Sequence, residues 1–172
     1  MQTFAHRNLP ALLLQAREAL MARRRPALRR HGLSDQQWRV LRVLAEAAGA
    51  AHTRVADQGA SSNECADCGV DGGIETGALA KGAFILGPSL TGILARMERD
   101  GLVVRKRSTR DARRFWVAAS PKGLALVGAL SVEIEFQYQE VSAHLGAERL
   151  TELYAMLDDL IEMKEGTDVT EA

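Results

Sequence analysis

The sequence predicts a mainly α-helical fold with one small β-hairpin. Hydrophobic residues make up 47% of the chain, and its commonest apolar residues, Ala and Leu, favour helices. Apolar residues recur at helical spacing in the stretches 9–30, 35–47, 88–99, 120–145 and 147–164. Two short stretches, 102–107 and 114–119, contain strand-favouring side chains and flank a turn-like Ser-Thr-Arg-Asp segment. The pattern therefore predicts several helices and one hairpin.

Capping residues indicate the ends of the second helix. Ser34 and Gln37 have the spacing of a capping box, in which each side chain bonds to the backbone N–H of the other residue. We therefore expect the helix to begin at Asp35. Gly49 is expected to end it after Ala47.

Two segments are expected to interrupt the helical pattern. Pro26 lies inside the stretch 9–30 and should kink or divide that helix, because proline lacks a backbone N–H and clashes with the preceding turn. Residues 49–74 show no periodicity and are rich in Gly, Ala, Ser and Asp, so a long loop is predicted there.

The central part of the chain predicts a helix-turn-helix. Residues 74–80 are expected to form a short helix and residues 83–87 a turn, while Pro88 suits the first position of the next helix, 88–99. The side chains of that helix expected to face inward are Leu90, Ile93, Leu94 and Met97. With the hairpin that follows, this order of elements is that of a winged helix-turn-helix.

Positive charge is concentrated in the second of these helices and in the hairpin. Between Arg96 and Arg114 there are eight Lys or Arg and three Asp or Glu, a net charge of +5 in a chain whose total is zero. Unpaired charges are costly inside a protein, so these side chains are expected at the surface. In a winged helix-turn-helix the helix enters the major groove of DNA and the hairpin lies along the phosphates. We therefore expect double-stranded DNA as a partner.

The two ends of the chain carry opposite charge and predict the domain organisation. Residues 1–32 have a net charge of +6 and residues 130–172 one of −9. Long amphipathic helices need a partner surface, so residues 1–32 and 120–165 are expected to form a homodimer interface around a DNA-binding lobe, 33–119, with an insertion at 49–74. Such a dimer suits a pseudo-palindromic operator. An intramolecular bundle of these helices is the alternative.

Other classes of protein are poorly supported. The sequence contains no nucleophile–base arrangement, phosphate-binding glycine loop or HExxH motif, and its four His are scattered, so an enzyme is not expected. An apolar run of about 18 residues and an apolar signal core are both missing, which favours a cytoplasmic protein outside the membrane. No cofactor and no bound metal are predicted.

Cys65 and Cys68 form a Cys-x-x-Cys pair inside the predicted loop. Two cysteines do not make a disulfide framework. Three interpretations stay open: two thiols in a loop, a redox-sensing pair, or half of a zinc site that would need His52 and one further ligand.

Two long segments resemble the MarR family of bacterial transcription regulators. Residues 33–46 are similar to the family's second helix, and residues 79–126 to its helix-turn-helix, wing and following helix. The family's Asp-x-Arg wing motif is present as Asp111-Ala112-Arg113, and the similarity covers most of the chain outside 49–74. Trp38-Arg39 and Pro-Ser-Leu-Thr at 88–91 resemble the subgroup that regulates aromatic-acid catabolism, the homoprotocatechuate-operon type.

The DNA-binding residues are predicted from charge, helix position and this resemblance. From the helix they are Pro88, Ser89, Thr91 and Arg96, and from the wing Lys106, Arg107, Arg110, Asp111 and Arg113. The resemblance implies that Arg113 reaches the minor groove and that Asp111 orients a neighbouring wing arginine. Gly92 departs from the family, in which this position is often basic, and removes one contact to a base or phosphate. A solvated charge run is the alternative interpretation.

An effector site is predicted around Trp38 and Arg39. A guanidinium at the edge of an apolar pocket offers a bidentate seat for a carboxylate, and an indole offers a wall for an aromatic ring. The resemblance places the effector pocket between the dimerisation helices and the DNA-binding lobe, where Met21 and Arg17 would also line it. Burial of Trp38 in the core, without a ligand, is the alternative.

Together these observations predict a regulator of transcription. We expect a repressor that a small aromatic carboxylate releases from its operator. The alternatives are an architectural winged-helix protein without an effector and a redox-sensing repressor that acts through Cys65 and Cys68.

Overall fold

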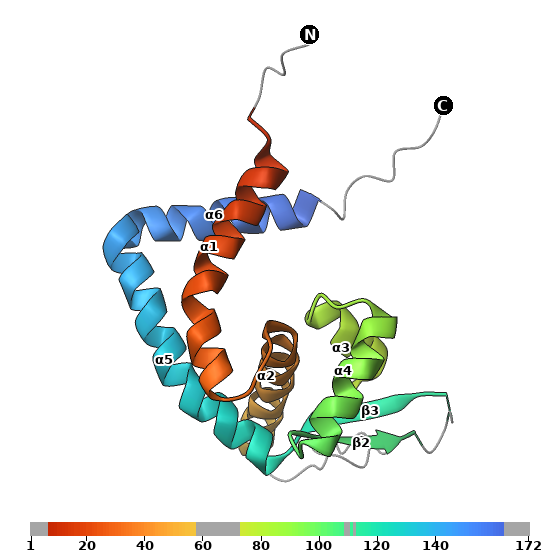
Figure 1. Ribbon diagram of the computed structural model, residues 1–172. Coiled ribbons are helices and arrows are strands. Elements are labelled where there is room, and N and C mark those ends of the chain that lie inside the picture. The colour runs from red at the N-terminus through yellow and green to blue at the C-terminus, as the bar shows by residue number, and fades with distance from the viewer. Residues whose placement is uncertain (1–6, 58–72, 109–110, 112, 164–172) are drawn as a thin grey trace, which may run out of the picture. The chain divides into compact units, whose positions relative to one another are not determined.

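A computed structural model describes residues 7–57, 73–108, 111 and 113–163, without the side chains of 51–57 (Figure 1). Two compact units make up the chain, residues 1–132 and 133–172. Each unit is described by itself.

The first unit contains most of the helices and all of the strands that the structure describes. Its elements are α1 (Leu9–Arg30), α2 (Asp35–Asp57), β1 (Ile74–Glu75), α3 (Thr76–Gly82), α4 (Gly87–Arg99), β2 (Val103–Arg107), β3 (Phe115–Ala119) and the first part of α5 (Pro121–Leu145). The second unit contains the rest of α5 and α6 (Ala147–Glu162). The predicted mainly α-helical fold with a small β-wing is confirmed.

The sheet has three antiparallel strands in the order β1-β3-β2. β2 and β3 form the predicted hairpin, paired from Val103↔Ala119 to Arg107↔Phe115. β1 was not predicted: the sequence indicated a helix from Ile74, but Ile74 and Glu75 pair with β3 and the helix begins at Thr76. A two-residue strand is too short to show alternation in the sequence, and its pairing with β3 defines it.

The capping-box prediction is confirmed, but the predicted end of α2 is wrong. Ser34 Oγ accepts a hydrogen bond from Gln37 N (3.2 Å), and Gln37 Oε1 accepts one from Ser34 N (2.9 Å). The helix continues past Gly49 to Asp57, so the first part of the predicted loop is helical. One glycine costs a helix only about 1 kcal/mol, and the alanines around Gly49 are strong helix formers. Residues 58–72, with Cys65 and Cys68, lie outside the described residues.

Pro26 does not divide α1, which is one helix from Leu9 to Arg30. Pro26 itself is exposed, whereas Ala27 and Leu28, which follow it directly, are buried. Burial of these two side chains offsets the hydrogen bond that proline cannot make. Gly32, with a φ of +69°, follows the end of the helix, where glycine accepts this left-handed conformation without strain.

The core of the first unit forms around α4, which packs against α2, α3 and β2. All four side chains of α4 predicted to face inward are buried. They share the core with Leu41 and Leu44 of α2, Leu79 of α3 and one valine from each strand of the hairpin, Val103 and Val117. The hairpin extends from the carboxyl end of α4 (Figure 1).

The corner between α4 and β2 is bonded to the start of α5. Ser120 Oγ donates to the carbonyl oxygen of Gly101 (2.6 Å) and accepts from Gly123 N (3.0 Å), so it caps the helix and holds the corner at once. Ser120 N donates to the carbonyl oxygen of Leu102 (3.0 Å), and Lys122 Nζ to that of Asp100 (2.8 Å).

The second unit exposes much apolar surface. None of the residues of α6 is buried, and the side chains of Leu153, Tyr154, Leu160 and Ile161 on its apolar face are all exposed. Among the described helices, none is by itself long and apolar enough to cross a membrane. α3 and α4 pass that test only as a pair bent by 103°, and their apolar side chains form the core described above.

Gly123 is predicted to be essential for stability. A Cβ at this position would lie 2.2 Å from the carbonyl oxygen of Leu102 and 3.2 Å from Leu41 Cδ2, so Gly123→Ala should lower the free energy of unfolding by about 2 kcal/mol or more. Gly128→Ala on the same helix meets nothing within 4 Å and should raise it by about 0.5–1 kcal/mol. Urea unfolding at one fixed protein concentration measures both. Equal stability of the two variants would contradict the close contact.

Candidate nucleic-acid interface and effector region

The outward face of α4 consists mainly of polar or small residues that are exposed to solvent. Pro88, Ser89, Thr91, Gly92 and Arg96 are all exposed, on the side of the helix opposite its buried leucines. No side chain caps the amino end of α4, where the N-cap residue is Leu86, so backbone N–H groups of the first turn stay available to an anion. A Cβ at Gly92 would meet nothing within 4 Å, so another molecule can approach the helix closely here.

The arginines of the hairpin differ in their surroundings. Arg105 and Arg107 lie on one face of β2, with their guanidinium carbons 4.9 and 6.0 Å from the centre of the Phe115 ring. Arg105 also lies 3.7 Å from Glu98 Oε2, and only 21% of its side chain is exposed. Arg105 therefore serves the hairpin itself, whereas Arg107 is exposed to solvent.

Asp111 organises the tip of the wing. Its Oδ1 accepts a hydrogen bond from Arg113 N (2.9 Å), and its Oδ2 lies 3.4 Å from Arg114 Nε. Ser108 Oγ accepts from Asp111 N (3.1 Å). Arg114 also pairs with Glu75 of β1 (3.3 Å), which joins the tip to the third strand.

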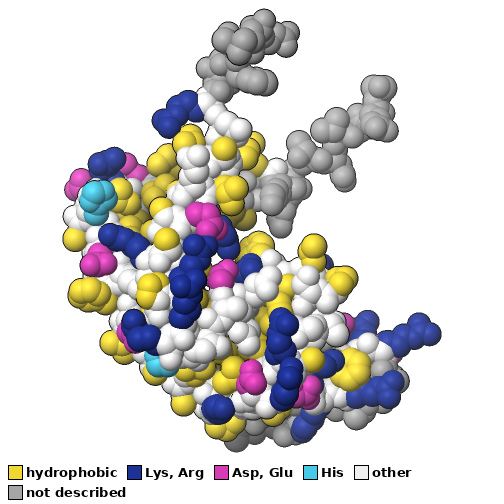
Figure 2. Space-filling model, viewed as in Figure 1, with side chains coloured by type: hydrophobic (Ala, Val, Ile, Leu, Met, Phe, Trp, Pro, Cys, Tyr) yellow, Lys and Arg dark blue, Asp and Glu magenta, His cyan; other side chains and the backbone are white. Residues whose placement is uncertain are grey.

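Among the wing arginines that the structure describes, Arg114 is the one whose side chain lies next to the carboxylate of Asp111. The side chain of Arg113 is exposed and forms no ion pair with another described residue. Arg110 lies outside the part of the chain that the structure describes. Figure 2 shows Lys and Arg side chains gathered over the end of the hairpin and near α4.

Three buried polar atoms of α2 lack hydrogen-bond partners among the described residues. They are two donors, Trp38 Nε1 and Arg39 Nε, and one acceptor, Asp35 Oδ1. Trp38 is 3% exposed, and Asp35 lies three residues before it on the helix, so Asp35 and Trp38 share a face. Met21 of α1 is buried as well. Leaving such groups unpaired costs about 1–3 kcal/mol each, so a ligand that bonds to them would bind favourably.

Arg39 is bonded to the helix-turn-helix turn, which the sequence did not indicate. Its Nη1 donates to the carbonyl oxygens of Ala83 (2.8 Å) and Phe84 (3.0 Å), and its Nε lies 3.4 Å from Asp35 Oδ2. The predicted bidentate seat for a carboxylate is therefore occupied by protein groups. Both of these hydrogen bonds come from Nη1, while Nε is buried without a hydrogen bond among the described residues.

Asp35 is a functional candidate that sequence reasoning missed. Arg17 Nη2 of α1 lies 3.3 Å from Asp35 Oδ2, the same oxygen that faces Arg39. The Asp35–Arg39 spacing of four residues on a helix was the available signal. Thus three of the predicted or newly found residues, Arg17, Asp35 and Arg39, form one charged cluster.

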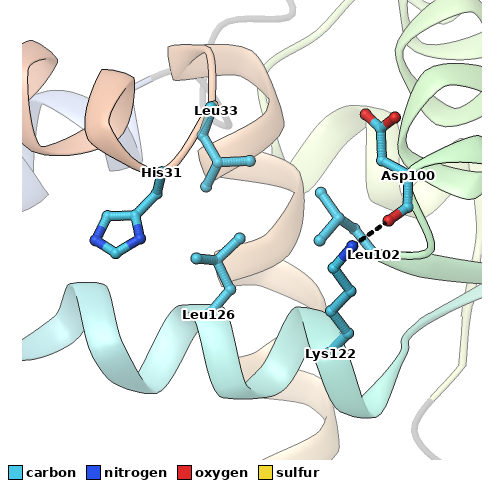
Figure 3. A pocket seen from close by; sticks show the side chains of 7 residues that line it. His31, Leu33, Asp100, Leu102, Lys122 and Leu126 are labelled. Atoms are coloured by element: carbon cyan, nitrogen blue, oxygen red, sulfur yellow. Dashed lines mark hydrogen bonds between the residues drawn. The ribbon is translucent and has the colours of Figure 1, made fainter.

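A hollow of about 510 Å³ lies apart from these residues. It is lined by His31, Gly32, Leu33, Asp100, Leu102, Lys122 and Leu126. In Figure 3 the three leucines point toward one another, the carboxylate of Asp100 points away, and Lys122 is bonded to the Asp100 carbonyl oxygen. Among the described residues, no group of three or more His, Cys, Asp or Glu could hold a metal ion.

Comparisons with known proteins agree with this geometry, although no family model matches the chain. The chain is 38% identical over 156 residues to the homoprotocatechuate degradative operon repressor of Escherichia coli, covering 91% of this chain and 89% of that protein. It is 34% identical over 160 residues to the transcriptional regulator FarR of Neisseria gonorrhoeae, covering 93% of each.

A solved structure, NadR in complex with 4-hydroxyphenylacetate, superimposes with a TM-score of 0.70. It is 34% identical and covers 93% of this chain and 96% of its own. Several further structural neighbours are named as MarR-family regulators. From its winged helix-turn-helix and these relatives, the chain belongs to the MarR family of transcriptional regulators.

Proposed function

We propose that this regulator is a homodimeric repressor that a small aromatic carboxylate releases from its operator. One observation carries the proposed binding of DNA. The exposed polar face of α4 is followed along the chain by a basic wing, and Asp111 bonds to the residues at the tip of that wing. A relative named as the repressor of an operon for homoprotocatechuate degradation supports the aromatic effector.

For DNA, α4 would enter the major groove and the hairpin would follow the backbone. On the helix, the candidates for contacts to bases and phosphates of DNA are Ser89, Thr91 and Arg96. Pro88 is exposed at the start of the helix and would lie close to the DNA as well. On the wing, Lys106, Arg107 and Arg110 supply charge, and Arg113 extends from the turn that Asp111 holds. Because Gly92 has no side chain to contact DNA, these arginines would supply a larger share of the affinity for DNA.

For the effector, the unpaired atoms of α2 indicate the chemistry. Trp38 Nε1 can donate to a carboxylate and Asp35 Oδ1 can accept from a hydroxyl, and one aromatic molecule that carries both groups would satisfy both atoms. 4-Hydroxyphenylacetate, the ligand in the NadR complex, has these two groups. Met21 would contact the apolar part of the effector. Arg17 and Arg39 pair with Oδ2 of Asp35, which leaves Oδ1 for the effector.

For the homodimer, the exposed apolar faces of the terminal helices provide the surface. Leu9, Leu13 and Leu14 of α1 are exposed, as are the apolar side chains of α6. Lone amphipathic helices are not stable with such faces in water, so a second copy is the expected partner. A two-fold dimer presents two copies of α4 to two half-sites of one operator.

Arg113→Ala is predicted to weaken DNA binding without unfolding the protein. Loss of one exposed cation from the wing should lower the affinity about ten-fold and reduce the slope of log affinity against log salt by about one. Fluorescence anisotropy with a DNA fragment selected by the wild-type protein from a random pool measures both. The control is Arg29→Ala, at an exposed arginine at the end of α1. Equal affinity of the two variants would exclude the role of Arg113.

Trp38→Phe is predicted to impair the effector response. The ring is kept but the donor is lost, so release of DNA should need about ten-fold more 4-hydroxyphenylacetate, the factor that corresponds to one hydrogen bond of about 1.4 kcal/mol. Trp116→Phe is a matched control, because Trp116 Nε1 on β3 is also buried without a partner. Titration of the DNA complex with 4-hydroxyphenylacetate measures the response. If both variants respond at the wild-type concentration, Trp38 does not bind the effector.

The double variant Leu153→Glu/Ile161→Glu is predicted to be monomeric. Two charges on the apolar face of α6 should prevent association, because burying unpaired carboxylates is costly. Sedimentation velocity would show the change in mass, and DNA affinity should fall with loss of the second half-site contact. Glu152→Gln, on the polar face of α6, is the control. A dimer that survives the double substitution would place the interface elsewhere.

A further inference from the structure

The turn between α3 and α4 contains a strained residue. Phe84 has a φ of +52° and is the only non-glycine residue with positive φ in the part of the chain that the structure describes. Phe84 N donates to Lys81 O (3.1 Å) and Ile85 N to Ala80 O (3.0 Å), the pattern of a helix-ending motif whose left-handed position is usually occupied by glycine. A bulky side chain is unfavourable in this conformation, so the surroundings must hold it there.

Packing of the Phe84 side chain does not stabilise the left-handed conformation of this residue. Phe84 is 85% exposed and Leu86, two residues later, is 80% exposed. Ile85, between them, is buried and anchors only the middle of the turn. The strained backbone therefore needs polar contacts.

Arg39 supplies those contacts from another helix. Its Nη1 donates to the carbonyl oxygens of both Ala83 and Phe84, the two residues that leave α3. Asp35, one helical turn earlier on α2, forms an ion pair with Arg39, in which Asp35 Oδ2 lies 3.4 Å from Arg39 Nε. Arg39 is largely buried at this position, with 27% of its side chain exposed.

We propose that Arg39 is a positioning residue for DNA binding: it stabilises the left-handed turn at Phe84 and thereby sets the direction in which α4 begins. α4 starts three residues after Phe84, at Gly87, so a change in the turn changes the position of every exposed residue of that helix. The proposal rests on the proposed binding of DNA by α4. It does not require that Arg39 touch DNA or effector.

The test combines Arg39→Lys with Phe84→Gly. Lysine keeps the charge but has a single nitrogen, which cannot stand both where Nη1 meets the two carbonyls and where Nε meets Asp35. We expect the Phe84 and Ile85 amides to exchange with solvent at least about five-fold faster in Arg39→Lys, while the amides of α5 keep their rates. Glycine accepts positive φ without strain, so Phe84→Gly in the Arg39→Lys background should slow this exchange again.

DNA affinity provides the second measurement. Affinity for the DNA fragment selected by the wild-type protein should fall about ten-fold in Arg39→Lys and recover to within about three-fold in the double variant, since coupled residues give non-additive effects. Arg29→Lys, at an exposed arginine of α1, is the control and should match the wild type in both measurements.

Each outcome decides a separate point. Unchanged exchange at Phe84 and Ile85 in Arg39→Lys overturns the proposal, even if the protein binds no DNA at all. Faster exchange with unchanged DNA affinity also overturns it, because the turn would then not position α4. A loss of affinity that Phe84→Gly does not restore would instead assign Arg39 a direct contact with DNA. If Arg39→Lys does not fold, Phe84→Gly in the otherwise wild-type chain must slow exchange at Ile85, or the strain argument fails.

Discussion

Burial of one face of α4 is the constraint on which the rest of the first unit depends. Leu90, Ile93, Leu94 and Met97 occupy the centre of a core made by α2, α3 and the hairpin. A helix that buries this face has only one way to present its polar residues, and that way is outward. The exposed polar surface of α4 is therefore a result of core packing, because burial of the apolar face sets the orientation of the helix.

The arginines of this lobe perform different tasks that composition alone cannot separate. Arg105 packs on Phe115 and lies near Glu98, Arg114 joins the wing tip to β1, and Arg113 extends to solvent. Arg39 bonds to backbone carbonyls inside the lobe. Each of these arginines carries the same charge. An arginine without a partner inside the protein can release counterions from DNA to the full extent, whereas a paired arginine releases fewer.

Much of this fold could be predicted from the sequence because its signals are long or chemically specific. The capping box at Ser34, the inward face of α4 and the hairpin strands followed directly from spacing and residue type. The end of α2 and the strand β1 could not be predicted, because one depends on alanines that outweigh a glycine and the other on pairing with a distant strand. The partners of Arg39 and the role of Asp35 also required the fold, since the turn carbonyls lie more than forty residues along the chain.

The bonded corner between α4 and β2 has a mechanical consequence. The carbonyl oxygens of Gly101 and Leu102 accept from Ser120, which caps α5, and that of Asp100 accepts from Lys122 in its first turn. Gly123 brings the helix against the corner without a side chain between them. The carboxyl end of α4, the base of the hairpin and the first turn of α5 are therefore held together as one piece. A rotation of the first turn of α5 would carry the hairpin and α4 with it, and the surface that these two elements form would keep its own shape.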